Sequence, residues 1–136
     1  MTVDFANKAL SRFKAREDLS FVLREQHQVV GTCSVPRLAW EVPVFEIGYW
    51  LRASARGRGL MTEAVIGLRD YLVQYCNPLR LEIRCDSANA ASRSVAVRTG
   101  FLEEATIRKS RRNNQGKLAD ETIYAWFPEE ITEVNR

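Results

Sequence analysis

A short turn containing two glycines offers the clearest chemistry in this sequence. Gly57 and Gly59 each follow an arginine, Arg56 and Arg58, and a helix is predicted to begin directly after them at Leu60. Glycine lets the backbone turn sharply and approach a ligand closely. The first turn of a helix presents unpaired N–H groups at the positive end of its dipole. The turn is therefore predicted to bind an anion such as a pyrophosphate.

The spacing of this turn excludes two common nucleotide-binding motifs. No Gly-Lys-Ser or Gly-Lys-Thr ends the turn, so it does not match a P-loop. The dinucleotide fingerprint needs a third glycine and an acidic residue about twenty positions further on. Taken alone, two glycines also suit an ordinary tight turn between a strand and a helix, so at this point both interpretations stay open.

Hydrophobic periodicity predicts the elements that position the turn. Helices are expected over residues 3–16, 60–76 and from Ser87 or Asn89 to Thr99, and strands over 19–23, 29–35, 44–51, 80–85, 101–108 and 122–127. Pro36 and Pro43 are expected to bracket a loop. The helix over 60–76 has an apolar stripe made by Leu60, Ala64, Leu68, Leu72 and Tyr75. This order of elements predicts a mixed α/β domain.

The composition fits one globular domain in a reducing compartment. The chain has 136 residues, a net charge of +3 and 46% hydrophobic residues, which suits a single domain. Three cysteines without a signal peptide or a long apolar run favour the cytoplasm, with the thiols buried. The lone His27 has no cluster of ligands around it, so no metal site is expected. The small excess of positive charge does not by itself indicate nucleic-acid binding.

Further segments join the glycine turn in a specific pattern. They are Glu46-Ile-Gly-Tyr-Trp-Leu51, Arg56-Gly-Arg-Gly-Leu-Met-Thr-Glu-Ala64, and Asn89-Ala-Ala-Ser92 followed by Gly100-Phe101. Together they resemble the GNAT superfamily of acetyl-coenzyme A-dependent N-acyltransferases, and in detail its RimJ/RimL branch of ribosomal-protein N-acetyltransferases. The resemblance covers about residues 20–127.

The resemblance implies a fold and a cofactor site. The fold would be a mixed, mostly antiparallel twisted sheet, splayed centrally and flanked by helices. Residues 1–136 would form a single acetyltransferase domain that lacks the first strand and helix usual in the family. Coenzyme A would lie in the V-shaped gap of the sheet. The implied cofactor-binding residues are Trp50, Leu51, Arg52, Arg56, Gly57, Arg58, Gly59, Leu60, Met61, Thr62, Asn89 and Ser92.

The resemblance also implies chemistry, namely acetyl transfer from acetyl-CoA to a primary amine by direct attack in a ternary complex. Glu46 aligns with a glutamate that some members use as a base. A water chain ending on Glu46 or Glu82, or a structural Glu46 paired with an arginine, is equally consistent. A backbone N–H near Leu51 would polarise the thioester. Many members carry a tyrosine seven residues after the asparagine, but Ala96 stands there. Ser92 is therefore the expected acid, although a serine there also suits a helix cap.

Other functions stay open on the sequence. The acceptor could be a protein N-terminus or a small amine. The chain could instead be a coenzyme A-binding module without turnover, which Ala96 and the short N-terminal part favour. It could also be a basic protein that docks on ribosomal RNA through residues 108–112. On the leading hypothesis neither a membrane nor nucleic acid is an expected partner, and an unpaired sheet edge would favour a homodimer.

Overall fold

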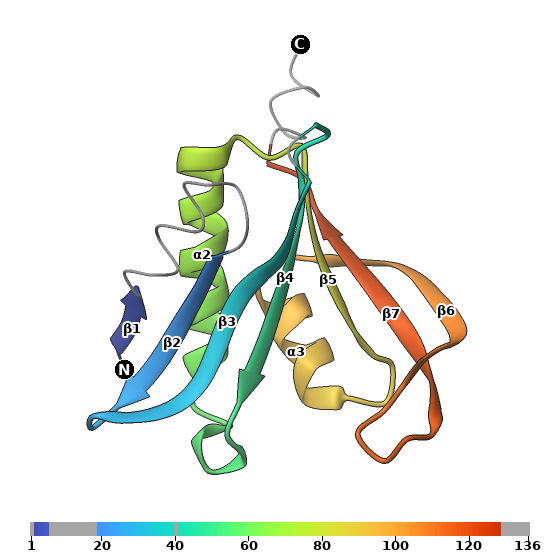
Figure 1. Cartoon of the computed structure of the whole chain (residues 1–136), viewed down its shortest axis with the longest axis horizontal. Helices are drawn as coiled ribbons and strands as arrows, with labels where there is room; N and C mark the ends of the chain where they lie inside the picture. Colours follow the sequence, from blue (N-terminus) through green and yellow to red (C-terminus); the bar gives the residue numbers. More distant parts are fainter. Residues whose placement is uncertain (1, 6–18, 40, 129–136) are drawn as a thin grey trace.

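The computed structural model describes residues 2–5, 19–39 and 41–128 and shows a twisted sheet with helices packed against it (Figure 1). The elements are β1 (Thr2–Phe5), β2 (Leu19–Glu25), β3 (Gln28–Ala39), β4 (Val44–Leu51), a 3₁₀ turn (Ala53–Ala55), α2 (Leu60–Cys76), β5 (Arg80–Asp86), α3 (Ala90–Arg98), β6 (Leu102–Arg112) and β7 (Leu118–Trp126). The predicted mixed α/β class is confirmed. Among the described residues, no helix is both long and apolar enough to cross a membrane.

The sheet opens in its middle, between β4 and β5. The described strands are ordered β1-β2-β3-β4-β5-β7-β6. β4 and β5 run parallel and pair only over three positions, which end at Glu46 opposite Glu82. Beyond this pair the two strands separate, as Figure 1 shows, while the other neighbouring strands pair antiparallel. The predicted mostly antiparallel sheet with a central splay is therefore confirmed.

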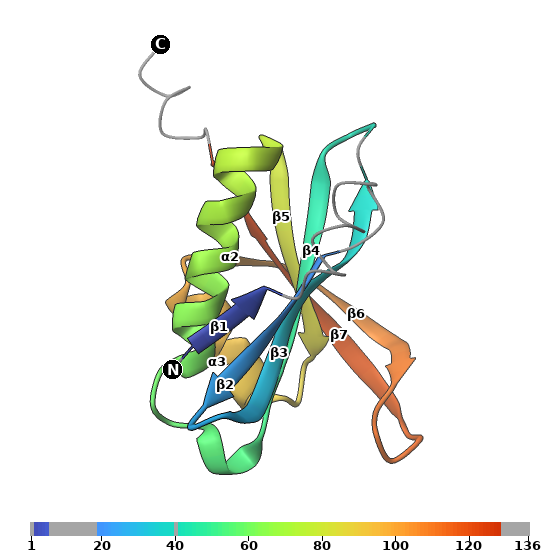
Figure 2. The same cartoon turned by 60° about the vertical axis from the view of Figure 1, so that its left-hand side comes forward.

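Helices α2 and α3 lie on one face of the sheet (Figure 2). The hydrophobic core is formed between these two helices and the sheet. Strand residues such as Phe45, Ile47, Leu81 and Ile83 alternate toward this face and are almost completely buried. The helices contribute Leu60, Met61, Ala64, Val65, Leu68, Leu72 and Ala96 to the same core. Because successive side chains of a strand point to opposite faces, β4 and β5 present Glu46, Glu82 and Arg84 on the face opposite α2 and α3, which is called the open face.

Helices α2 and α3 both begin beside the splay, and local backbone features explain where each one begins. Gly59, the residue before α2, has a φ of +74°, which glycine adopts without strain. The Asn89 side-chain oxygen accepts the Ser92 N–H at 3.1 Å and so caps α3. After α3, Gly100 has a φ of +89°, the left-handed conformation predicted for this position. The predicted bounds 60–76 of the long helix are also confirmed.

Three predicted features are wrong. Thr2–Phe5 form a strand rather than the start of a helix, because they pair with the edge of β2; the rest of that predicted helix lies outside the described residues. The loop expected from Pro36 is strand as far as Ala39, and the register shift between Ser34 and Arg37 makes room for the proline. Tyr75 is 63% exposed, because Cys76 takes the buried position.

Candidate functional site

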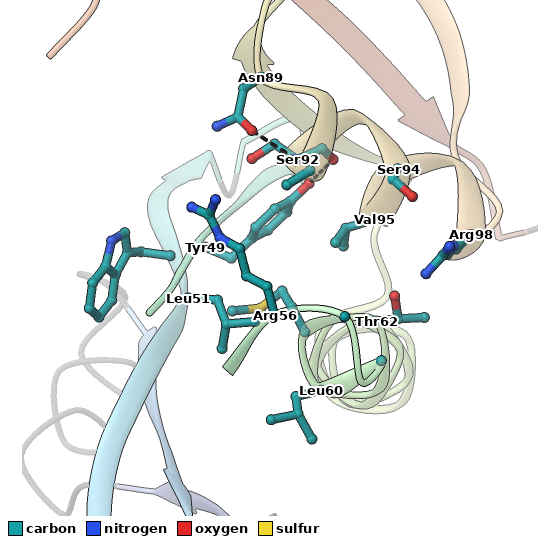
Figure 3. Close-up of a pocket in the computed structure, with 15 residues that line it drawn as sticks. Tyr49, Leu51, Arg56, Leu60, Thr62, Asn89, Ser92, Ser94, Val95 and Arg98 are labelled. Carbon is teal, nitrogen blue, oxygen red and sulfur yellow. Dashed lines mark hydrogen bonds between the residues drawn. The ribbon is translucent and has the colours of Figure 1, made fainter. Parts of the chain in front are cut away.

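A cavity of about 290 Å³ lies where the end of β4, the glycine turn and the two helix starts meet (Figure 3). Its wall comes from segments that are far apart in the sequence. It is lined by Tyr49, Trp50, Leu51, Arg56, Gly57, Gly59, Leu60, Met61, Thr62, Asn89, Ala91, Ser92, Ser94, Val95 and Arg98. The structure thus brings together most of the residues that the sequence pattern singled out.

The floor of this cavity is a set of backbone N–H groups. The amides of Leu60, Met61 and Thr62 belong to the first turn of α2, and none donates to a backbone acceptor among the described residues. Gly57, with a φ of +83°, and Gly59 leave open space where side chains would stand. The turn is therefore not filled by its own side chains, and its amides can receive an anion.

Two arginines of this cavity have no partner among the described residues. Within the part of the chain that the structure describes, Arg56 and Arg98 form neither an ion pair nor a side-chain hydrogen bond. Figure 3 shows Arg98 extending from α3 toward Thr62 at the start of α2. By contrast Arg93, one turn earlier on α3, binds Tyr124, Ser87 and Glu103. Positive charge without a partner beside open amides favours a ligand that carries phosphate groups.

Tyr49 joins β4 to α3 at the back of the cavity. Its hydroxyl donates to the Ser92 backbone oxygen at 2.7 Å. Burial raises the pKa of Tyr49, as do neighbouring groups that include Cys85 and Cys33, so the hydroxyl stays protonated and keeps donating. The Ser92 hydroxyl forms no hydrogen bond within the described residues and remains available to a ligand.

A second, more polar cavity of about 360 Å³ adjoins the first. It is lined by Tyr49, Arg84, Cys85, Asp86, Asn89, Ser92, Arg111, Asn113, Asn114 and Gln115. Three of these residues, Tyr49, Asn89 and Ser92, also line the first cavity. The two cavities therefore meet at the splay, and groups bound in each could approach one another there.

The end of β4 turns a backbone N–H toward this meeting point. The Arg52 amide donates to the Val30 oxygen of β3 at 2.7 Å. Backbone N–H groups of a strand alternate in direction, so the Leu51 amide points away from β3. The neighbour on that side is β5, which has already separated from β4. The Leu51 N–H thus faces the gap and is placed to polarise a carbonyl.

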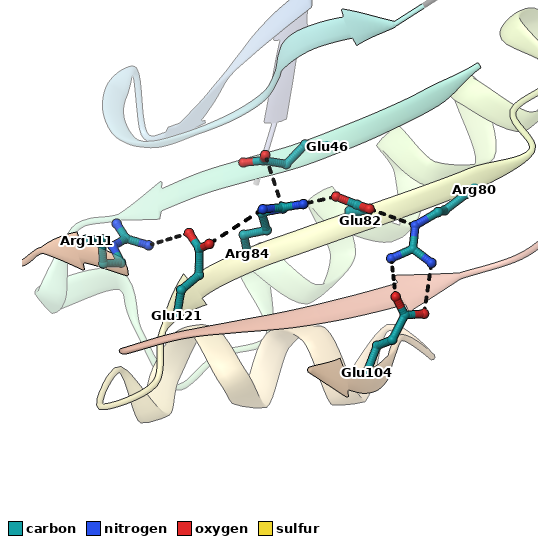
Figure 4. Close-up of polar contacts among 7 residues, drawn as sticks. All are labelled: Glu46, Arg80, Glu82, Arg84, Glu104, Arg111 and Glu121. Atoms are coloured by element: carbon teal, nitrogen blue, oxygen red, sulfur yellow. Dashed lines mark hydrogen bonds and ion pairs between the residues drawn. The ribbon is translucent and has the colours of Figure 1, made fainter. Parts of the chain in front are cut away.

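Glu46 lies on the open face of the sheet, in a network of alternating charges (Figure 4). Arg84 is its centre, 3.1 Å from Glu82, 3.6 Å from Glu121 and 4.0 Å from Glu46. The network continues from Glu82 to Arg80 at 2.7 Å, from Arg80 to Glu104 through two contacts, and from Glu121 to Arg111 at 3.7 Å. Glu46 therefore has the arginine neighbour that its structural interpretation requires.

Three predicted site residues do not line the first cavity. Glu46 lines neither cavity, although its contact Arg84 lines the second. Arg58 forms a two-point contact with Glu25, with both distances 2.7 Å. Arg52 donates to the Val29 oxygen at 3.0 Å. Arg58 and Arg52 thus connect the glycine turn and the end of β4 to β2 and β3. Their roles in binding a cofactor stay predictions.

The sequence analysis missed Tyr49, Ala91, Ser94, Val95 and Arg98. The four α3 residues lie at spacings that place them on one helix face with Ser92, and this signal could have added them to the site. Tyr49 follows the buried Phe45 and Ile47 at alternate positions along β4, but this pattern does not indicate its contact with α3.

Comparison with known proteins identifies related sequences and structures. Residues 1–102 match a family model described as acetyltransferase (GNAT) domain. The ribosomal-protein-serine acetyltransferase of Escherichia coli strain K12 is 30% identical over 105 residues, covering 77% of this chain and 58% of that protein. An uncharacterized N-acetyltransferase, p20 of Bacillus licheniformis, is 29% identical over 111 residues, covering 82% and 62%. The chain thus spans about three fifths of the length of these curated relatives.

A solved structure extends the comparison to the fold. The microcin C7 self-immunity acetyltransferase MccE, crystallised with acetyl-CoA and AMP, matches with a TM-score of 0.79 and 25% sequence identity. The match covers 89% of this chain and 67% of that one. With a ribosomal-protein acetyltransferase among the relatives, the predicted resemblance to the RimJ/RimL branch is confirmed.

Proposed function

The chain belongs to the acetyltransferase (GNAT) domain family, and on this premise we propose that it transfers an acetyl group from acetyl-CoA to a primary amine. Transfer proceeds by direct attack in a ternary complex. The observation that carries the proposal is that two cavities meet at Tyr49, Asn89 and Ser92. The first cavity has open amides and two arginines without a partner in the described part of the chain, and the second is polar. The whole of residues 1–136 is proposed to form this one catalytic domain.

The first cavity fits coenzyme A. The amides of Leu60, Met61 and Thr62 would hold the pyrophosphate, and Arg56 and Arg98 would balance the phosphate charge. The exposed backbone edge at the end of β4 would pair with the pantetheine, whose amides need such partners in a gap that contains no strand. The acetyl thioester supplies the activated acyl group that the reaction transfers.

The residues at the meeting point then have separate tasks. The Leu51 N–H hydrogen-bonds the thioester oxygen and stabilises the negative charge that develops on it as the amine nitrogen attacks the carbonyl carbon. The carbon–sulfur bond breaks, and the Ser92 hydroxyl donates its proton to the departing thiolate and regains one from water. Ala96 is completely buried in the core, so the serine takes the task of the tyrosine that many members have there.

Glu46 is the proposed base, acting through water. It stands at the last paired position of β4, where the splay begins, and its contact Arg84 lines the second cavity. Before the attack, the acceptor ammonium would lose a proton along water to the Glu46 carboxylate and on to solvent, which leaves the neutral amine as the nucleophile. Glu82, which contacts both Arg80 and Arg84, is the alternative end of this water chain.

The acceptor enters through the second cavity and is a protein N-terminus or a small amine. The printed name of the Escherichia coli relative, an acetyltransferase of ribosomal-protein serine, supports the first class. Cys33, Cys76 and Cys85 are free and buried, which supports a reducing cytoplasmic setting. A homodimer stays a prediction.

The activity is tested by calorimetry with acetyl-CoA, followed by free-thiol release with a panel of peptides and small amines. We expect saturable binding and amine-dependent thiol release. Binding without release from any amine would identify a coenzyme A-binding module, and salt-sensitive RNA binding without coenzyme A binding would identify the basic interaction protein instead.

The two side-chain assignments have separate tests. Ser92→Ala should lower kcat on the order of 100-fold with coenzyme A affinity retained, whereas Ser54→Ala, an exposed serine outside the cavity, should not. Glu46→Gln should flatten the rise of rate with pH. An unchanged kcat in Ser92→Ala or an unchanged pH profile in Glu46→Gln would remove that residue from the mechanism.

A further inference from the structure

Gly31, on β3, makes an unusually close approach to β4. It lies opposite Leu51 in the antiparallel ladder and is buried. A side-chain carbon built on Gly31 would overlap the Trp50 carbonyl oxygen and lie 3.2 Å from the Leu51 α-carbon. Gly57, Gly59, Gly67 and Gly116 have open space at the same position. β3 and β4 can therefore come this close only because residue 31 has no side chain.

The Trp50 oxygen that an added carbon would overlap belongs to the peptide group whose N–H is proposed to polarise the thioester. The Trp50 carbonyl and the Leu51 N–H are the two ends of one peptide group, and in a trans peptide they point in opposite directions. No cis peptide bond occurs in the described chain. With its carbonyl against β3 at Gly31, this peptide aims its N–H into the gap where the two cavities meet.

We propose that Gly31 is a positioning residue for acetyl transfer. By letting β3 hold the Trp50–Leu51 peptide close, it fixes the place and tilt of the Leu51 N–H relative to the thioester oxygen. The inference rests on the proposed function. A side chain at position 31 would push this peptide toward the gap, and a displacement on the order of 1 Å in a reacting centre can lower a rate about 100-fold.

The position of Gly31 argues against a simple packing role. Glycine inside a strand weakens the strand, because it lacks a side chain to pack and has more freedom when unfolded. Gly31 also pairs with Leu23 of β2, next to the register shift between Leu23 and Arg24. The irregularity of β2 and the glycine of β3 thus occur together beside the end of β4, where strand geometry sets the direction of the catalytic N–H.

The experiment compares Gly31→Ala with Gly67→Ala, a substitution in α2 where the added carbon meets nothing within 4 Å. Each variant is measured for urea unfolding, coenzyme A affinity and kcat with the best amine of the panel. We expect Gly31→Ala to lower kcat at least tenfold while coenzyme A affinity changes less than about threefold, because the amides that bind the pyrophosphate lie on α2. Gly67→Ala should keep both.

Comparing the affinities for acetyl-CoA and coenzyme A separates a positioning effect from a general loss of structure. If the Leu51 N–H contacts the thioester oxygen, Gly31→Ala should lose the wild-type difference in affinity between acetyl-CoA and coenzyme A. A folded Gly31→Ala protein with kcat within twofold of wild type, or with kcat and coenzyme A affinity reduced equally, overturns the proposal. Failure of the wild-type protein to bind coenzyme A would instead overturn the proposed function.

A second pair of variants decides the question if Gly31→Ala does not fold. Leu51→Pro deletes the N–H that faces the gap and leaves the β3–β4 ladder intact, because proline is tolerated where a strand's N–H has no strand partner. Leu51→Ala removes the same side chain but keeps the N–H. A kcat at least tenfold lower in Leu51→Pro than in Leu51→Ala supports the proposal, and equal values overturn it.

Discussion

The two sides of the splay use arginine in opposite ways. On the helix-covered side, Arg56 and Arg98 line a cavity without a partner among the described residues. On the open face, Arg80, Arg84 and Arg111 each contact one or more glutamates. Arginines of the two groups look alike in a sequence. The difference teaches that arginines without a partner among the described residues indicate the proposed phosphate site, whereas the paired arginines join different strands.

The largest expected effect is on the open face, with Arg84→Ala. This change leaves Glu46, Glu82 and Glu121 close together without their shared cation. Because these carboxylates are only 13–26% exposed, we expect the free energy of unfolding to fall by about 2 kcal/mol, below the value for a fully buried pair. Urea unfolding measures the change, and coenzyme A affinity should stay within about twofold.

Arg84→Lys is the matched control for this change. It keeps one positive charge but loses the planar group that reaches several carboxylates at once, so it should recover part of the lost stability. If Arg84→Ala unfolds at the wild-type urea concentration, the open-face network does not hold the strands together and the contrast between the two sides fails.

The next effect lies in the cavity, with Arg98→Ala and Arg56→Ala. Each should weaken coenzyme A binding about tenfold, or about 1.4 kcal/mol, through the loss of one charge-assisted contact. Stability should change by less than about 0.5 kcal/mol, since neither side chain has a partner within residues 2–5, 19–39 and 41–128 that would be left unpaired. Calorimetry with coenzyme A and dephospho-coenzyme A at two salt concentrations would report which phosphate each arginine contacts.

Arg108→Ala is the matched control for the cavity arginines. Arg108 is exposed on β6 and lines neither cavity, so its loss should leave affinity within about twofold. Equal losses in Arg98→Ala and Arg108→Ala would mean that only the overall charge of the protein attracts the ligand.

The elements that the sequence predicted best are those whose periodicity is long and whose ends carry a local signal. Helix α2 has a regular apolar stripe and is followed by Asn77-Pro78, and its predicted bounds are those observed. Residues 2–5 carry no such signal, because Val3 and Phe5 fit a strand as well as a helix. Pairing with β2 then decides their conformation, and a partner strand distant in the sequence is invisible to local pattern reasoning.

The part of the candidate site that a single segment forms could be predicted from the sequence. The parts that several distant segments form together could not. The glycine turn followed from its own residues, since its φ angles and open amides are local properties. The second cavity needs the β6–β7 turn beside β5 and α3, and the Arg84 network needs β4, β5, β6 and β7 side by side. Neither arrangement leaves a mark in the spacing of any single segment.

The smallest expected effect is at Tyr49, where the two cavities meet. Tyr49→Phe removes the hydrogen bond to the Ser92 oxygen and should lower stability by about 1 kcal/mol near pH 7. It should also lower kcat, because α3 is then held less firmly against β4. Tyr49 lines both cavities, so this variant tests the connection between the two cavities rather than either one.

The pH dependence of stability gives this variant a sharper test. Burial raises the pKa of Tyr49 in the folded protein. The contribution of the protonated hydroxyl to the free energy of unfolding is therefore fully present below the unfolded pKa of about 10. It is lost as pH rises from there through the folded pKa, since the unfolded chain then releases its proton more readily. The wild-type protein should therefore lose stability faster than Tyr49→Phe above about pH 10. Parallel unfolding curves between pH 9 and pH 11, on the order of one unit either side of that pKa, would show that Tyr49 is not held in a buried contact with α3.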